Sequence, residues 1–254
     1  MSVAQAVERP QPLNSSASVR GMGEEEKRRF VHRLFTNIAP RYDWFNRLAS
    51  LGLDQRWRQE VVQRGGIEGG LRVLDVCAGT GDLACLCARR QGRTGLVVGV
   101  DFNAAMLARA SVKQCSHGLH VDWLQGDAQA LPFADASFDR VVIGFSTRNL
   151  SDLTAGLREM VRVLRPGGKL LILETGRPSN PVMRAGYLLF LFTVARAIGF
   201  ILTGRLWPFT YLARSVQGFL TPQQFIERLQ TVGTGAVYVP LSNGLASLYI
   251  AVKT

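Results

Sequence analysis

Paired cysteines and clustered histidines are missing from this 254-residue chain, which has only three histidines. Its four cysteines form no C-x-x-C pair: Cys77, Cys85, Cys87 and Cys115. The absence of such pairs argues against a redox motif and favours reduced, structural thiols in a cytoplasmic protein. His117 and His120 have no third ligand nearby in the sequence. The sequence therefore predicts no metal site.

Acidic residues are also scarce, with 19 Asp and Glu against 30 Lys and Arg, which leaves a formal charge of +11 and a pI near 10.2. This imbalance favours an anionic partner, either nucleic acid or an acidic membrane face. No Lys-rich run and no RNA-binding module accompany the charge, so we expect no nucleic-acid partner.

The N-terminus has no apolar core of the kind that a secretory signal peptide requires. Its first 22 residues are polar, with Pro, Ser and Gln, and are predicted to be a disordered tail. Residues 23–254 are long enough and, in a chain that is 47% hydrophobic, apolar enough to form a single domain with a substantial core.

Helical spacing dominates residues 23–66, which we expect to form an N-terminal helical cap. The stretch EEEKRRFVHRLFTNIA begins with acidic residues and places five apolar side chains on one helical face: Phe30, Val31, Leu34, Phe35 and Ile38. Pro40 ends this helix, and a second helical run follows it.

From Leu71 onward, short apolar runs alternate with helical stretches, a pattern typical of a parallel sheet covered on both faces. The predicted strands are 72–77, 95–101, 120–124, 138–144 and 169–174. The predicted helices are 81–91, 103–115 and 153–164, with the last ending at Pro166-Gly167. Two final runs, 236–241 and 245–253, flank Ser-Asn-Gly and predict an antiparallel hairpin that closes the sheet.

An apolar insertion, residues 177–220, interrupts this pattern. Residues 186–203 are nearly all apolar, with Arg196 in the middle, and five arginines but no carboxylate lie between Arg177 and Thr221. This composition favours a lid or a membrane-contact element at the interface. An ordinary core helix and a true membrane span remain the alternatives, although Arg196 would be costly in a span.

The strongest local motif is VLDVCAGTGDLA, residues 73–84, in which a predicted strand runs into a glycine loop and a helix. The spacing Gly79-x-Gly81-x-x-Ala84 also satisfies a relaxed dinucleotide fingerprint, so a nicotinamide-dependent oxidoreductase is a rival interpretation. Asp75 and Asp82, however, crowd the loop with negative charge. Carboxylates suit the ammonium and sulfonium groups of S-adenosylmethionine better than a pyrophosphate.

Further carboxylates follow the next two predicted strands. Asp101 lies where a carboxylate can accept both ribose hydroxyls of a cofactor, and the next residue, Phe102, is a further expected cofactor contact. Asp127 can accept from an adenine amino group, and the backbone amide of Ala128 can address the ring edge. Each of the two aspartates alone could instead be a helix N-cap.

Four segments look like the motif series of class I S-adenosylmethionine-dependent methyltransferases: DVCAGTGDLA, GVDFNAAMLARA, GDAQALPFADASFDRV and LREMVRVLRPGGKLLILE. Residues 31–58 and GFSTRNLSD, residues 144–152, narrow the resemblance to the C-methyltransferases of menaquinone and ubiquinone biosynthesis. The resemblance covers roughly residues 30 to 230. It departs at Ser146-Thr147, where the family usually has Gly-Leu, and at Glu174-Thr175-Gly176, where it usually has Glu-Phe-Ser.

The resemblance implies a Rossmann-like methyltransferase fold, cofactor contacts at Thr80, Asp101, Asp127 and Ala128, and a cofactor-facing strand end at Gly144. It implies C-methylation of a polyprenylated quinol, demethylmenaquinol first and the methoxy-polyprenyl-benzoquinol of ubiquinone synthesis second. An RNA methyltransferase is a third alternative. We expect S-adenosylhomocysteine as the second product, no metal, and a cytoplasmic enzyme held peripherally on anionic lipid at the inner face of the membrane. Whether it is a homo-oligomer stays open.

Methylating a quinol carbon requires loss of a phenolic proton. Arg148 is the candidate to stabilise the phenolate or to orient a water, and Asn149 to donate to a ring oxygen. Tyr42 and Asp43, from the segment that resembles the family, are candidates to line the cavity or to accept the proton. Structural alternatives remain for each, namely an Arg148–Asp152 pair, a helix cap at Asn149 and simple packing of Tyr42.

Overall fold

The structure, a computed structural model, describes residues 22–116 and 118–254. The predicted tail lies outside these residues except for Met22, and so does His117. Cys77, Cys85 and Cys87 are free thiols, and the side chain of Cys115 is not among those described.

Within the described residues, seven strands form one sheet in the order β3-β2-β1-β4-β5-β7-β6. β7 is antiparallel to both of its neighbours, while the other paired strands run parallel. The strands are β1 (Arg72–Val76), β2 (Leu96–Asp101), β3 (Asp122–Gln125), β4 (Phe138–Gly144), β5 (Leu164–Thr175), β6 (Thr234–Leu241) and β7 (Ala246–Lys253). The predicted α/β class and its antiparallel C-terminal hairpin are confirmed.

One predicted boundary is wrong. The helix before β5 was expected to end at Pro166-Gly167, but it ends at Val163, and β5 begins at Leu164. Leu164 is fully buried and pairs with Phe138 of β4, so tertiary contacts draw this residue into the sheet. Gly167 (φ +74°) then lies in an irregular part of the strand, where the register shifts.

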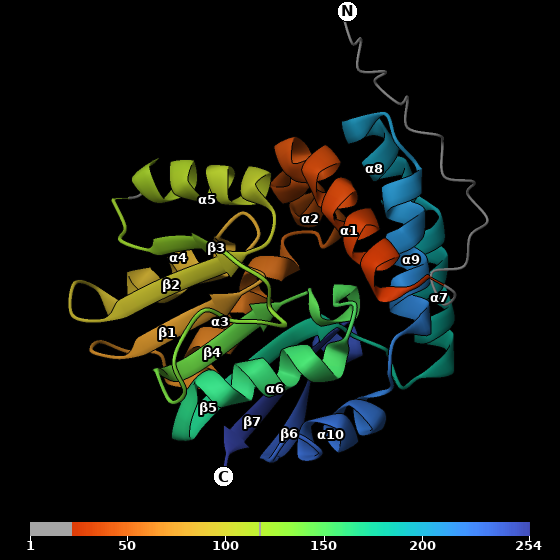
Figure 1. The fold of residues 1–254 in the computed structure, drawn as a ribbon. Coiled ribbons are helices and arrows are strands. Elements are labelled where there is room, and N and C mark those ends of the chain that lie inside the picture. Colours follow the sequence, from red (N-terminus) through yellow and green to blue (C-terminus); the bar gives the residue numbers. More distant parts are fainter. Residues whose placement is uncertain (1–21, 117) are drawn as a thin grey trace, which may run out of the picture.

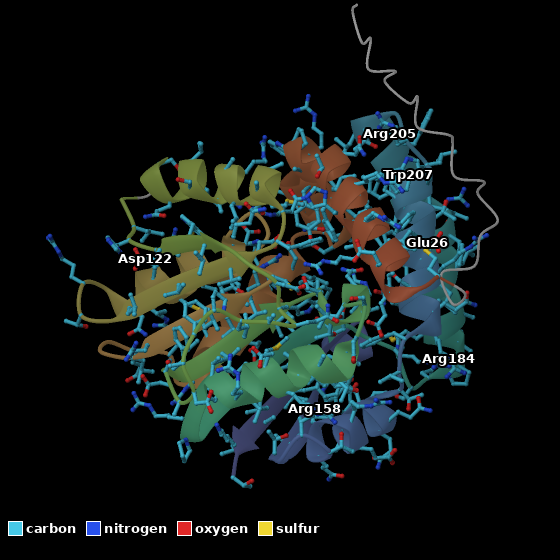
Figure 2. All side chains as sticks on the ribbon, viewed as in Figure 1. Glu26, Asp122, Arg158, Arg184, Arg205 and Trp207 are labelled. Atoms are coloured by element: carbon cyan, nitrogen blue, oxygen red, sulfur yellow. The ribbon has the colours of Figure 1, made fainter. Side chains whose placement is uncertain are left out.

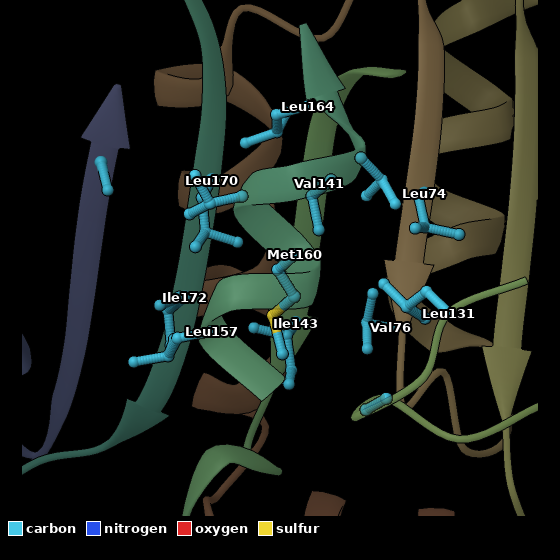
Figure 3. Packing of buried hydrophobic residues seen from close by; sticks show 14 of the residues in the cluster. Leu74, Val76, Leu131, Val141, Ile143, Leu157, Met160, Leu164, Leu170 and Ile172 are labelled. Atoms are coloured by element: carbon cyan, nitrogen blue, oxygen red, sulfur yellow. The ribbon is translucent and has the colours of Figure 1, made fainter. Parts of the chain in front are cut away.

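Helices cover both faces of the sheet (Figure 1). On one face α3 (Leu53–Gly65) and α4 (Asp82–Gln91) pack on the central strands, and α5 (Ala104–Ser116) packs on β2 and β3. On the other face lie α6 (Leu153–Val163) and α10 (Pro222–Gln230). Leu157 and Met160 of α6 pack on the side chains of the central strands there, as Figure 3 shows. These two cores fix the carboxyl ends of the strands at one edge of the sheet.

A helical layer covers that edge (Figure 1). It consists of α1 (Glu24–Ile38), α2 (Tyr42–Ala49), α7 (Pro181–Phe192), α8 (Val194–Thr203) and α9 (Trp207–Gly218), with the short 3-10 turn Ala39–Arg41 between the first two. Their apolar faces form clusters separate from the sheet cores. The predicted cap, residues 23–66, is therefore divided, because α3 packs on the sheet and only α1 and α2 belong to the layer.

The apolar run predicted at 186–203 is two helices, because Thr193 (φ −117°, ψ −80°) interrupts the helical backbone between α7 and α8. By length and composition, Pro181–Thr203 is the one segment among the described residues that could cross a membrane, and 17% of its most apolar window is buried. This low burial shows that the run is not an ordinary core helix, since most of its side chains lie at the surface.

Candidate active site

A cleft opens where β1, β2 and β4 end beneath the helical layer. Eight residues predicted from the sequence as cofactor contacts line it: Asp75, Gly79, Thr80, Asp101, Phe102, Asp127, Ala128 and Gly144. The ninth, Gly81, is not among the lining residues. The carboxyl ends of parallel strands are where open α/β sheets bind their ligands, so the position agrees with a cofactor cleft.

Gly81 serves packing rather than the cleft. It precedes the first residue of α4 and has φ +80°, in the left-handed region that favours glycine. A Cβ at this position would lie 2.6 Å from Cη2 of Trp123 and 2.9 Å from Cβ of Ala110. The glycine therefore lets α4 begin directly against α5 and β3.

Replacing Gly81 with alanine is expected to lower the free energy of unfolding by about 2–4 kcal/mol, through overpacking and a strained backbone. Chemical denaturation measures this loss. Gly204→Ala is the matched control, because Gly204 has the same left-handed backbone (φ +68°, ψ 12°) but a Cβ there meets nothing within 4 Å. Equal losses for the two variants would show that backbone strain alone is at work.

Asp101 is held rigidly in the cleft. Its Oδ2 accepts from the amide of Gly79 and its Oδ1 from the amide of Asn103, both at 2.8 Å. Burial raises the pKa of this carboxyl. The alternative role as an N-cap is wrong, because Asn103 caps α5 by accepting from the amides of Ala105 and Met106. Asp101 thus links the glycine loop to the end of β2.

Asp127 is likewise no helix cap, because the chain turns back through an isolated bridge between Asp127 and Ala130. Its Oδ1 accepts from the amide of Gln129 at 2.9 Å. Its Oδ2 pairs with Nη2 of Arg28 at 2.8 Å, and Arg28 itself lines the cleft. α1 therefore covers this end of the cleft, and the predicted adenine contact of Asp127 stays a prediction.

Asp75 is the unsatisfied group of the cleft. The side chain is buried, and its Oδ2 has no hydrogen-bond partner among the residues that the structure describes. Burial raises the pKa of this carboxyl to about 8. A buried carboxylate without a cation is costly, and an ammonium group would satisfy it. The unpaired carboxylate of Asp75 therefore fits S-adenosylmethionine, whose amino acid part carries an ammonium group.

The affinity for S-adenosylhomocysteine is expected to weaken as the pH falls from 8 to 6. Asp75 with a pKa of about 8 is protonated at lower pH, and a ligand ammonium group must first displace that proton. The loss is about fivefold from pH 8 to pH 7 and about ninefold from pH 7 to pH 6, or about 50-fold over this range. Isothermal titration calorimetry measures it. Asp75→Asn should bind weakly with a nearly flat profile; a steep profile in that variant would assign the effect to another group.

A charge network connects α2 to the glycine loop. The hydroxyl of Thr80 donates to Oδ1 of Asp43 at 2.5 Å, and Lys113 on α5 pairs with Oδ2 of Asp43 at 2.9 Å. Lys113 also pairs with Asp82 at 2.5 Å. The structure therefore does not bring Asp43 into the cavity as a proton acceptor, since it is paired behind the loop and is absent from the lining of the cleft.

An apolar cavity of about 380 Å³ adjoins the cleft beneath α1, α2, α7 and α9. Three residues line both spaces, namely Phe35, Tyr42 and Asn149. Tyr42 packs edge-on against Phe35 with ring centroids 5.9 Å apart, and burial raises the pKa of its phenol. Tyr42 thus both packs against Phe35 and lines the cleft and the cavity. Phe35, Tyr42 and Asn149 form the boundary between the two spaces.

Arg148 lines the apolar cavity and is buried with Glu174. Its Nη1 donates to Glu174 Oε1 and, at 2.7 Å, to the carbonyl of Phe145, whereas its Nε has no partner among the described residues. Burial alone would lower the pKa of Arg148, but the carboxylate of Glu174 raises it, so the guanidinium stays charged. The alternative pair with Asp152 is wrong, because Asp152 caps α6.

Asn149 is not a helix cap either. Its Oδ1 accepts a hydrogen bond from the hydroxyl of Tyr211 on α9 at 3.0 Å, and its Nδ2 lies 3.5 Å from the carbonyl of Phe145. Sequence reasoning missed Tyr211, Glu174, Arg28 and Lys113 as site residues. Glu174 could have been noticed as a carboxylate at the end of an apolar strand; the others gave no local signal.

The sheet order, the antiparallel β7 and a carboxylate-lined cleft after a glycine loop define a class I S-adenosylmethionine-dependent methyltransferase. Solved structures share the fold at low identity. A methyltransferase from Aquifex aeolicus matches with a TM-score of 0.59 and 19% identity, covering 78% of this chain and 89% of that one. A putative methyltransferase from Methanococcus maripaludis matches with a TM-score of 0.60 and 21% identity, covering 86% and 93%.

Residues 22–253 match the model of the ubiE/COQ5 methyltransferase family, and the chain belongs to that family. It is 36% identical to "Ubiquinone/menaquinone biosynthesis C-methyltransferase UbiE" of Hahella chejuensis, covering 90% of this chain and 93% of that protein. It is 37% identical to "Demethylmenaquinone methyltransferase" of Deinococcus radiodurans (91% and 95%) and 39% identical to "2-phytyl-1,4-naphtoquinone methyltransferase" of Thermosynechococcus vestitus (88% and 99%). Membership of this family excludes the nicotinamide-dependent oxidoreductase.

Proposed function

We propose that this protein transfers a methyl group from S-adenosylmethionine to a ring carbon of a polyprenylated quinol, with demethylmenaquinol as its substrate. The observation that carries the proposal is the apolar cavity of about 380 Å³ that shares Phe35, Tyr42 and Asn149 with the cofactor cleft. A hydrophobic ring and the first part of a prenyl tail fit such a cavity. The names of the three relatives support a quinone substrate.

Bound S-adenosylmethionine supplies an electrophilic methyl group, and the residues of this chain prepare the quinol. Arg148, which lines the apolar cavity and stays charged beside Glu174, stabilises the phenolate oxygen by its positive charge. A guanidinium with a raised pKa cannot accept the phenolic proton, so Arg148 acts as an electrostatic group or orients a water that accepts it. Asn149 donates from Nδ2 to a ring oxygen, while Phe35 and Tyr42 exclude water from the boundary.

Expression in cells that lack their quinone C-methyltransferase tests the substrate. Mass spectrometry should detect restored methylation of menaquinone. Restoration of ubiquinone alone would favour the methoxy-polyprenyl-benzoquinol, a substrate that the name of the Hahella relative also allows. If neither quinone regains its methyl group while the purified protein binds S-adenosylhomocysteine, the quinol proposal fails and the cofactor assignment survives.

We further propose that α7 and α8 contact an anionic membrane surface on the cytoplasmic side, where a polyprenyl tail resides. Six side chains on these helices are large, apolar and exposed: Val182, Met183, Leu189, Val194, Phe200 and Ile201. Arg184 and Arg205 lie at the outer edge of the same helical layer (Figure 2). The break at Thr193 leaves helices of 12 and 10 residues, each shorter than the roughly 20 that a membrane span needs. This shape favours peripheral binding.

Replacing Val182 and Ile201 together with aspartate is expected to weaken binding to phosphatidylglycerol vesicles about tenfold or more, because it removes apolar contact and adds negative charge. Co-sedimentation measures the binding. Val112→Asp on α5, 72% exposed, is the control and should bind like the wild type. Unchanged binding combined with a smaller molecular mass in solution would instead identify this face as a contact between copies of the chain.

A further inference from the structure

Tyr211 connects α9 to the side chain of Asn149. Its hydroxyl donates to Asn149 Oδ1 at 3.0 Å. The ring is 6% exposed and lies against Phe30 of α1, with centroids 5.1 Å apart. Tyr211 also lines the apolar cavity. One side chain therefore joins α1, α9 and the turn that carries Arg148 and Asn149.

The direction of this hydrogen bond decides which end of the Asn149 amide is left for a ligand. A carboxamide can rotate by half a turn and exchange its oxygen with its NH₂ group. The carbonyl of Phe145, 3.5 Å from Nδ2, can only accept. A neutral phenol can donate or accept, so the Phe145 carbonyl decides the direction: Nδ2 faces this carbonyl, and Oδ1 accepts from the Tyr211 hydroxyl. This arrangement leaves one N–H of Nδ2 without a partner among the residues that the structure describes.

We propose that Tyr211 is a positioning residue for methyl transfer: by donating to Asn149 Oδ1, it turns the Asn149 amide so that an N–H faces the reacting oxygen of the substrate. This inference rests on the proposed function, because it assumes a quinol oxygen at the boundary that Asn149 lines. A fixed N–H stabilises a phenolate, whereas a fixed carbonyl oxygen would repel it. Because Tyr211 belongs to α9, the orientation of the Asn149 N–H depends on α9 lying over the strand ends.

A double-mutant cycle tests the proposal through turnover. Tyr211→Phe removes only the hydroxyl and is expected to lower kcat about tenfold, the effect of one oriented hydrogen bond, with KM for the quinol and the affinity for S-adenosylhomocysteine within about twofold of the wild type. In the Asn149→Ala background, Tyr211→Phe should have no further effect on kcat. A second tenfold loss in that background would overturn the inference, as would a Tyr211→Phe variant with full activity.

Tyr238→Phe on β6 is the matched control, since Tyr238 lines neither the cleft nor the cavity; its kcat should equal that of the wild type. The contact is also tested without substrate, by a thermal unfolding cycle in which the Tm losses of Tyr211→Phe and Asn149→Ala should sum to more than the loss of the double variant. Additive Tm losses would overturn the contact itself. Absence of wild-type turnover on either quinol would overturn the proposed function, and the thermal cycle would still decide on the contact.

Discussion

Arg148→Lys is expected to lower kcat for methyl transfer about 100- to 1,000-fold, the usual effect of losing one preorganised oxyanion donor. Lysine keeps a positive charge beside Glu174 but lacks the planar guanidinium that holds both Glu174 and the Phe145 carbonyl. The affinity for S-adenosylhomocysteine should stay within about twofold, because Arg148 does not line the cofactor cleft. Steady-state kinetics and calorimetry measure the two quantities.

Two further variants separate chemistry from folding in this experiment. Arg165→Lys changes a surface arginine paired with Asp139 at 2.7 Å and should leave kcat unchanged. Arg148→Met combined with Glu174→Gln removes both buried charges, so the fold is spared an unpaired carboxylate. A double variant that folds and binds S-adenosylhomocysteine but does not turn over supports a catalytic Arg148. Wild-type turnover in the variant that combines Arg148→Met with Glu174→Gln would make Arg148 a structural residue.

Asp101→Asn is expected to weaken S-adenosylhomocysteine binding about 100- to 1,000-fold, through loss of two charge-assisted hydrogen bonds to ribose hydroxyls. A second cause adds to this effect. The amide NH₂ of asparagine would face the backbone N–H of either Gly79 or Asn103, so the glycine loop would lose one of its two supports. Isothermal titration calorimetry measures the affinity.

Asp122→Asn is the control for Asp101. Asp122, which is labelled in Figure 2, lies on the neighbouring strand β3 at the edge of the sheet and is exposed. Its binding should match the wild type. If Asp101→Asn binds S-adenosylhomocysteine within about threefold of the wild type, Asp101 supports the loop without contacting the ligand, and the ribose assignment is wrong.

The local features of the fold could be read from the sequence because their causes are local. Apolar runs of strand length and helical periodicity placed the core elements of the sheet to within a few residues. The glycine loop and the carboxylates after β2 and β3 predicted which strand ends would face a ligand. Eight of the nine residues assigned on this basis do line one cleft.

Gly81 shows where this local reasoning stops. Its spacing fits a ligand-binding fingerprint, but the atoms that require a glycine belong to Trp123 and Ala110, which the fold brings to the loop from α5 and β3. The start of β5 at Leu164 also has a tertiary cause. Pairing of Leu164 with Phe138 draws the chain into the sheet, although the turn signal Pro166-Gly167 follows directly.

The sequence by itself determined the fold class, the cofactor cleft and the candidates Arg148 and Asn149, because hydrophobic periodicity, turn chemistry and motifs act over a few residues. Only the tertiary structure decided which polar groups pair. Thr80 meets Asp43 across 37 residues, Arg148 meets Glu174 across 26, and Asn149 meets Tyr211 across 62. Each pair forms because whole helices pack over the strand ends and bring together residues that are distant in the sequence. A buried polar or charged group then pairs with the group that lies beside it in the folded chain.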